Sequence, residues 1–275
     1  MADLQSSVDE LWEHRAELSP ADVDAARIVE EAIGLLDSGQ ARVAEVDAAT
    51  DQVVVHEWLK KSILMLFSLR GMETIEHGPF EYADKLPLKH DFAAAGVRVV
   101  PGASARWGSF LSRGVVLMPS YVNIGAWVGE NSMVDTWATV ASCAQIGARV
   151  HLSGGVGIGG VLEPPNAVPV VVEDDAFIGS RCMVTGGARV GRGAVLSAGS
   201  FLDPSIPVID AESGEEISRG VVPPWCVAIR ASRRREYPGG EFFIPCVLVI
   251  KRLNEGERHD KAQLNEILRQ HGASA

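Results

Sequence analysis

A six-residue repeat in the middle of the chain limits its possible folds more than any other feature. Stepping by six from Val116 reaches only aliphatic residues as far as Ile158. The stops are Val116, Val122, Val128, Val134, Val140, Ile146, Leu152 and Ile158. Small residues stand four positions after the earlier stops, at Ser120, Ala126, Ser132, Ala138 and Ala144. Three such hexads build one triangular coil of a parallel β-helix, in which the aliphatic residues fill the interior.

The repeat is interrupted once. Continuing from Ile158 reaches Pro164, within the segment GGVLEPPNAVPVV, and a proline-rich segment cannot hold a strand ladder. We therefore expect a loop that leaves the prism here. The repeat resumes, shifted by two positions, at Ile178 and continues through Val184, Val190, Leu196 and Leu202.

The segments on either side of the repeat differ from it in composition. Residues 1–97 predict a helical domain, with one helix capped by Ser19 and ending at Gly39, and a second over 55–71. Residues 98–203 form the predicted β-helix. Residues 204–275 predict a turn-rich extension with the hydrophobic strand EFFIPCVLVIKRL and a short terminal helix around KAQLNEILRQ. We expect the strand to lie beside the prism and the helix to cap it.

Composition excludes several classes of protein. The chain has 275 residues and a net charge of −11, which argues against a general nucleic-acid binder. It has no apolar run of about 18 residues, and MADLQSSVDELWEHR is too polar for a signal peptide, so we expect a cytoplasmic protein that does not enter membranes. The four cysteines are far apart and contain no C-x-x-C pair, which indicates reduced, packed thiols.

A hexapeptide prism alone does not define a function. Its uses include acyl-CoA-dependent acyltransferases, metal-dependent hydratases and non-catalytic spacers. A hydratase needs three histidines around one metal, but only His151 lies in the repeat, so we expect no metal. The threonine ladders typical of a flat structural prism are missing as well.

Longer segments resemble one family closely. They are RVVPGASARWGSFLSRGVVLMPSYVNIGAWV, MVDTWATVASCAQIGARVHLSGGVGIGGVLEPPNAVPVVVEDDAFIGSR, RIVEEAIGLLDSGQARVAE and WLKKSIL. Together they resemble tetrahydrodipicolinate N-succinyltransferases of bacterial lysine and diaminopimelate biosynthesis, over nearly the whole chain. The resemblance implies a left-handed β-helix and a homotrimer with active sites at subunit boundaries. It also implies that succinyl-CoA lies in a groove between neighbouring prisms and that the helical domain helps to form the amino-acid pocket.

Two site residues follow from the resemblance. Arg98 matches the arginine of G-x-R-V-V-P, and its guanidinium suits one carboxylate of a dicarboxylic substrate. Asp135 matches the aspartate of M-V-D-T-W-A-T-V, where a carboxylate would bind the acceptor amine and remove its proton. Taken alone, Asp135 is more typical of a solvated corner. Arg98 is equally typical of an ion pair at the entrance of the prism.

Met183 departs from the family pattern. Members carry a glutamate in a segment F-I-G-A-R-S-E-V, and FIGSRCMV places Met183 on that glutamate within the substrate site. A thioether cannot move a proton. Either a nearby acid among Glu173, Asp174 and Asp175 replaces it, or the protein is a non-catalytic paralogue, or the site has been changed for another acceptor or donor. The third interpretation would fit an acetyl-CoA-using relative of the tabtoxin-biosynthesis branch, and we favour it.

The remaining candidates concern the acyl-CoA cosubstrate. Gly154 and Gly155 could offer backbone N–H groups to the thioester or pantetheine, although glycine also suits tight corners. Arg230, Arg233 and Lys251 belong to the main concentration of positive charge and could bind CoA phosphates, or form a solvated basic loop. His151 is expected to be a packed structural residue rather than a base. The sequence thus predicts a CoA-dependent N-acyltransferase that acts on tetrahydrodipicolinate or a related amino-dicarboxylate.

Overall fold

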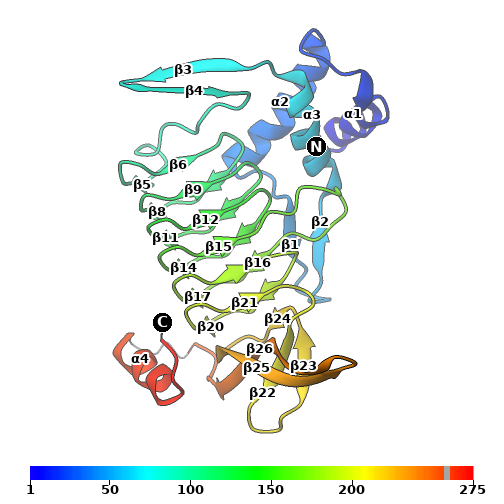
Figure 1. The fold of residues 1–275 in the computed structure, drawn as a ribbon. Coiled ribbons are helices and arrows are strands. Elements are labelled where there is room, and N and C mark those ends of the chain that lie inside the picture. Colours follow the sequence, from blue (N-terminus) through cyan, green and yellow to red (C-terminus); the bar gives the residue numbers. More distant parts are fainter. Residues whose placement is uncertain (257–260, 275) are drawn as a thin grey trace.

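Most of the chain forms a three-faced prism of short parallel strands, with helices at one end and a long β-ribbon at the other (Figure 1). This computed structural model describes residues 1–256 and 261–274. The expected left-handed β-helix of hexapeptide repeats is the observed architecture. Within the described residues, no helix is long and apolar enough to span a membrane.

Each face of the prism is a ladder of parallel strands, and the chain passes from face A to face B to face C in every coil. Face A contains β5 (Arg98–Val99), β8 (Val116–Leu117), β11 (Met133–Val134), β14 (His151–Leu152), β17 (Phe177–Ile178) and β20 (Val195–Leu196). Face B contains β6 (Ser104–Ala105), β9 (Tyr121–Val122), β12 (Thr139–Val140), β15 (Gly157–Ile158), β18 (Met183–Val184) and β21 (Phe201–Leu202). Face C contains β7 (Phe110–Leu111), β10 (Trp127–Val128), β13 (Gln145–Ile146), β16 (Val171–Val172), β19 (Arg189–Val190) and β24 (Val221–Val222).

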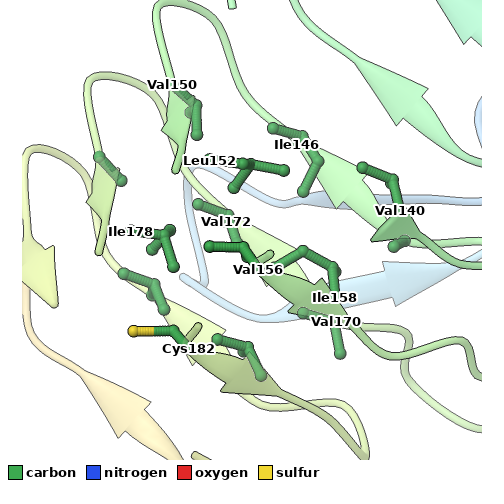
Figure 2. Packing of buried hydrophobic residues seen from close by; sticks show 14 of the residues in the cluster. Val140, Ile146, Val150, Leu152, Val156, Ile158, Val170, Val172, Ile178 and Cys182 are labelled. Atoms are coloured by element: carbon green, nitrogen blue, oxygen red, sulfur yellow. The ribbon is translucent and has the colours of Figure 1, made fainter. Parts of the chain in front are cut away.

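The interior of the prism is filled by the second residue of each strand and by the residue two positions before it. Figure 2 shows Val150 with Leu152 and Val156 with Ile158 pointing into the same core. The small residues of the repeat therefore limit the side-chain volume inside the prism, in addition to allowing tight corners. The predicted first stop is wrong, because Leu117 is fully buried while Val116 is the outward partner of Met133. The chain takes five residues from Leu117 to Val122, and this short step restores the register used afterwards.

The predicted loop leaves the prism between β15 and β16, at the edge between faces B and C. The ladder resumes at Val172, one hexad earlier than the predicted Ile178. Lys60 is fully buried, and its Nζ donates to the carbonyl oxygens of Pro164 at 3.1 Å and Ala167 at 2.7 Å. Burial lowers the pKa of this ammonium. Since its donors reach two loop carbonyls, Lys60 fixes the loop to the helical domain.

The N-terminal domain contains helices and two hairpins. The helices are α1 (Ala2–Glu13), the 3₁₀ helix η1 (Arg15–Glu17), α2 (Val23–Ser38) and α3 (Glu57–Leu69), and the hairpins are β1 (Ala44–Val46) with β2 (Val53–Val55) and β3 (Glu73–His77) with β4 (Phe80–Asp84). The two hairpins were not predicted from the sequence. The cap was also misplaced, because Ser19 bonds to Asp22 and α2 begins only at Val23. Gly39 ends α2 in the left-handed conformation, as expected.

The N-terminal domain covers face C. Arg42 lies 4.2 Å above the ring of Trp127 and donates to Gln145, and Arg189 donates to the backbone oxygen of Asp51 at 2.8 Å. These contacts join one face of the prism to the β1–β2 hairpin and the end of α2. Face B and the upper coils of face A are left open to solvent or to a partner.

The C-terminal part extends the prism and then leaves it. β22 (Pro207–Asp210), β23 (Glu216–Arg219), β25 (Cys226–Tyr237) and β26 (Gly240–Arg252) join the sheet of face A. The basic segment 230–235 lies in β25, so the loop interpretation was wrong. Helix α4 (Lys261–Gln270) places Leu268 against Val195 and Val227, and covers the lower end of face A.

The buried thiols predict alkaline instability. Burial raises the pKa of Cys143 and of Cys226 to about 12 and that of Cys182 to about 11. A thiol in the unfolded chain has a pKa of about 8.5, lower than in the folded protein. The folded state is therefore favoured fully below a pH of about 8.5, and this advantage is lost as the pH rises towards the pKa values of the buried thiols. We expect the free energy of unfolding to fall by roughly 1–2 kcal/mol per thiol between pH 8 and 10. Urea unfolding under reducing conditions measures it. Cys143→Ala should reduce this pH-dependent fall in the free energy of unfolding by the contribution of one thiol. A variant whose stability falls as steeply as that of the unchanged protein would contradict the assignment to Cys143.

Candidate active site

Several predicted site residues lie along the edge between faces A and B, which we call the A/B edge. Asp135 follows β11 at this edge, and Gly154 and Gly155 occupy the next coil. Backbone bonds align the coils, because Gly155 N donates to Thr136 O at 2.8 Å and Arg181 N donates to Gly154 O at 3.0 Å. Successive coils stand about 4.8 Å apart. The structure therefore places Asp135, Gly154 and Gly155 at one edge of the prism, on adjacent coils.

Asp135 is held in a defined orientation. Its Oδ1 accepts the backbone N–H of Thr136 at 2.7 Å and the Thr136 hydroxyl at 3.3 Å. Its Oδ2 lies 4.0 Å from Nε2 of His151, whose ring is stacked on Phe177 with a centroid distance of 5.1 Å. The carboxylate is about a third exposed. One oxygen is thus fixed by the backbone, and the other, on a side chain that is about a third exposed, can accept a hydrogen bond from an amine.

Met183 lies on the outer side of face B, one strand beyond the A/B edge. Its side chain is 45% exposed and covers Gly157, where an added Cβ would lie 2.4 Å from Met183 Sδ. Phe201, the next residue down the same column, is 42% exposed. The upstream acids do not replace the missing glutamate here, because Asp174 and Asp175 lie at the C/A edge and bind Arg149 and Arg192. Met183 and Phe201 therefore form a small pair of exposed apolar side chains on face B.

The A/B edge carries two arginines below Asp135. The side chain of Arg181 lies over Gly155, within 3.0 Å of the place of an added Cβ, and Arg230 Nη1 lies 3.4 Å from the corresponding point of Gly199. Neither guanidinium has a carboxylate partner in the described part of the chain. Each glycine thus leaves room for the arginine of the following coil. The resulting column presents two positive charges along one line.

The other cation candidates do not join this column. Arg233 Nη1 is ion-paired with Glu216 at 2.7 Å on the projecting ribbon, and Lys251 lies opposite Val227, away from the edge. Arg98 lies on face A, in the same outward column as Met133 and His151 but in the first coil. It is exposed and has no ion-pair partner among residues 1–256 and 261–274. The predicted set is therefore split between the A/B edge, the top of face A and the C-terminal ribbon.

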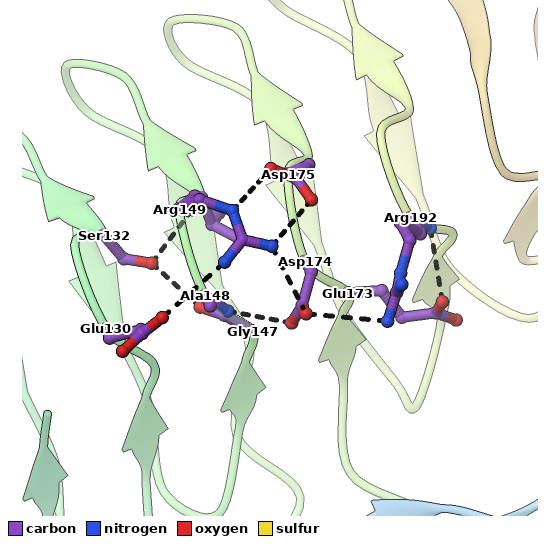
Figure 3. Close-up of polar contacts among 10 residues, drawn as sticks. Glu130, Ser132, Gly147, Ala148, Arg149, Glu173, Asp174, Asp175 and Arg192 are labelled. Carbon is purple, nitrogen blue, oxygen red and sulfur yellow. Dashed lines mark hydrogen bonds and ion pairs between the residues drawn. The ribbon is translucent and has the colours of Figure 1, made fainter. Parts of the chain in front are cut away.

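The charged residues of the C/A edge are paired with one another. Figure 3 shows Arg149 between Glu130, Asp174 and Asp175, and Arg192 beside Asp174. The bonds from Arg149 to Asp175 are bidentate, at 2.8 and 2.9 Å. These contacts join successive coils. The two arginines of this network are therefore neutralised by carboxylates, unlike Arg181 and Arg230 at the A/B edge.

Two residues of the A/B edge were missed at the sequence level. Arg181 occupies the corner position that glycine takes in the coils above and below, with a φ of 60°. Trp137 takes the same position beside Asp135, with a φ of 61° and a side chain that is 73% exposed. A bulky residue in this conformation is strained, which is typical of functional corners. Aligning the corners rather than the aliphatic stops would have found both.

Comparisons with known proteins agree on one family. Residues 3–69 match the family described as tetrahydrodipicolinate N-succinyltransferase N-terminal, and residues 169–204 match the hexapeptide repeat of succinyl-transferase. The 2,3,4,5-tetrahydropyridine-2,6-dicarboxylate N-succinyltransferase of Methylorubrum extorquens is 46% identical over 98% of this chain and 99% of its own length. That of Dechloromonas aromatica is 43% identical over 97% and 98%.

A solved structure supports the fold alone. The crystal structure of a putative 2,3,4,5-tetrahydropyridine-2-carboxylate N-succinyltransferase from Campylobacter jejuni gives a TM-score of 0.51 at 19% identity, and covers 84% of this chain and 63% of the other. The full-length relatives carry the assignment. The chain belongs to the tetrahydrodipicolinate N-succinyltransferase family.

Proposed function

We propose that this protein is a CoA-dependent N-acyltransferase that transfers a succinyl group from succinyl-CoA to the amine of tetrahydropyridine-2,6-dicarboxylate in its ring-opened form. The full-length similarity to enzymes of that name carries the proposal. The proposal is also supported by Asp135, which is oriented by the backbone N–H of Thr136 and is partly exposed at the A/B edge. The assembly we propose is a cytoplasmic homotrimer, whose open faces meet so that the A/B edge of one prism lines a groove with its neighbour.

The chemistry is a direct transfer. Asp135 Oδ2 accepts a proton from the acceptor ammonium, and the neutral amine attacks the thioester carbonyl. The C–S bond of the tetrahedral intermediate then breaks, an amide forms, and the CoA thiolate takes up a proton. Arg98 would bind a carboxylate of the acceptor, and Gly154 N–H would reach the acyl donor, because no acceptor for it lies among the described residues. The rate enhancement then comes from positioning the amine beside the thioester and from removal of the ammonium proton.

We further propose that Arg181 and Arg230, which lie in one column at the A/B edge, bind the phosphates of acyl-CoA. Arg233 and Lys251 lie outside this column and are not part of the proposed phosphate site. Replacing both with Met should raise the KM for succinyl-CoA at least about tenfold, because charge-assisted bonds to phosphate are lost. The KM for a succinyl-pantetheine thioester, which lacks the nucleotide phosphates, should not change. Arg219→Met with Arg234→Met removes two paired surface arginines as a control. Equal effects on both donors would contradict the phosphate assignment.

An acetyl-CoA-using relative with a different amino-acid acceptor remains the second candidate, and the exposed apolar pair of Met183 and Phe201 favours it. Thiol release distinguishes the two. Succinyl-CoA and acetyl-CoA would each be tested with tetrahydropyridine-2,6-dicarboxylate, open-chain L-2-aminopimelate and lysine. Turnover with succinyl-CoA and the first acceptor supports the main proposal, and turnover only with acetyl-CoA supports the second. If no pair releases thiol although the protein still binds CoA, the protein is a non-catalytic paralogue.

A further inference from the structure

The β3–β4 hairpin projects from the body of the protein, and no other strand of the described chain pairs with it. It runs from the helical domain across the upper end of the prism, and its tip lies above the side that holds β5 and β8 (Figure 1). An isolated two-stranded hairpin is at best marginally stable in water. A contact outside the chain would therefore stabilise it.

One side of this arm is apolar and uncovered. Ile75 and Tyr82 are directly opposite each other in the hairpin, and Phe80 lies on the same side as Tyr82. Their exposed fractions are 37%, 54% and 60%, and Met72 at the base is 62% exposed. A contiguous exposed apolar patch marks an interaction surface.

The other side of the arm carries uncompensated negative charge. Glu76 and Glu81 are directly opposite each other, an arrangement that is unfavourable for like charges. Neither has an ion-pair partner in the described ranges. A cation from outside the chain would remove this repulsion.

The complementary charge lies on the first coil of the prism. Arg98 and Arg113 are exposed at the upper rim of face A, and no carboxylate pairs with either among residues 1–256 and 261–274. The base of the arm is fixed at the same level, because Asp84 pairs with Arg106 at 2.8 Å. In a ring of parallel prisms, the first coil of the next copy stands at the same level as the first coil that the arm crosses.

From these observations we propose that the β3–β4 arm docks on a second copy of this chain, with its acidic side against the upper rim of face A. The arm and the rim are different patches, so the contact is head-to-tail and closes a ring. A segment of this length buries only a few hundred Å² per partner, roughly half of a standard interface. The arm therefore strengthens an assembly that the prisms also hold, and its tip comes close to Arg98 of the neighbouring subunit.

Photo-crosslinking tests this directly. Ala83, which is exposed on the same side of the arm as Glu81, would be replaced by p-benzoylphenylalanine, and subunits labelled with ¹⁴N and ¹⁵N would be mixed before irradiation. We expect crosslinked peptides of mixed label that contain residues near 98 or 113. Crosslinks within one chain only, or none, would overturn the proposal.

Charge reversal gives an independent measurement. Glu76→Arg with Glu81→Arg should raise the concentration at which the oligomer dissociates about tenfold, and Arg113→Glu in the same chain should restore it. Asp24→Arg with Glu31→Arg makes the same change of charge on the exposed side of α2 and should have no effect. A trimer that is unaffected by the arm variants would refute only the arm contact. A monomer at every concentration would refute the proposed trimer as well.

Discussion

Asp135→Asn is expected to lower kcat by about 10²–10⁴ while changing the KM for both substrates little, which is the usual range for a lost general base. The amide retains the shape of the side chain and can still accept the backbone N–H of Thr136 at 2.7 Å. It cannot take a proton from the acceptor ammonium at pH 7. Steady-state kinetics with succinyl-CoA and tetrahydropyridine-2,6-dicarboxylate measure the effect.

Asp203→Asn is the matched control. Asp203 also follows a prism strand and accepts from the backbone N–H and hydroxyl of Ser205, but it lies at the edge between faces B and C. It should leave kcat within about twofold of the unchanged protein. A loss of activity in both variants would indicate a general requirement for corner carboxylates, and an active Asp135→Asn would exclude Asp135 as the base.

Met183→Glu has the second largest expected effect, an increase in kcat with tetrahydropyridine-2,6-dicarboxylate of about tenfold or more. The cyclic imine must add water and open before its amine can react, so two carboxylates can divide the acid and base steps. Met183 is 45% exposed, so a carboxylate there would remain solvated and would disturb no core. The increase in kcat should be smaller with L-2-aminopimelate, which has no ring to open.

Met183→Gln separates shape from charge in this experiment, because it adds a polar group of similar size that cannot transfer a proton. If the glutamate and glutamine variants gain activity equally, polarity rather than acid–base chemistry explains the change. If neither gains, Met183 does not limit turnover of this acceptor, and the interpretation of a changed site fails.

The interior of the prism could be predicted because one physical requirement acts on every coil. Aliphatic side chains such as Val134 and Leu152 fill most of the core, so their period is visible in the sequence. The misplaced stop at Val116 has the same origin. Two adjacent aliphatic residues, Val116 and Leu117, both satisfy the pattern, and only the five-residue step to Val122 decides which one faces inward.

The N-terminal hairpins and the edge arginines could not be predicted in this way. The pairs in the β3–β4 arm, such as Ile75 with Tyr82, are exposed, so no alternation of buried and polar residues marks them. Arg181 is positioned by a glycine in the preceding coil, far away in the sequence. The resemblance identified Asp135 from a local motif, but the column that it shares with Arg181 and Arg230 depends on the stacking of coils.

The most direct test of the central claim is to follow the acyl group itself. Succinyl-CoA labelled with ¹³C in the succinyl carbonyl would be incubated with the protein and tetrahydropyridine-2,6-dicarboxylate, and the products analysed by NMR and mass spectrometry. The account predicts that the label appears in an amide on the nitrogen of the opened acceptor, together with an equal amount of free CoA. Label found only in free succinate, or retained in succinyl-CoA, would contradict it.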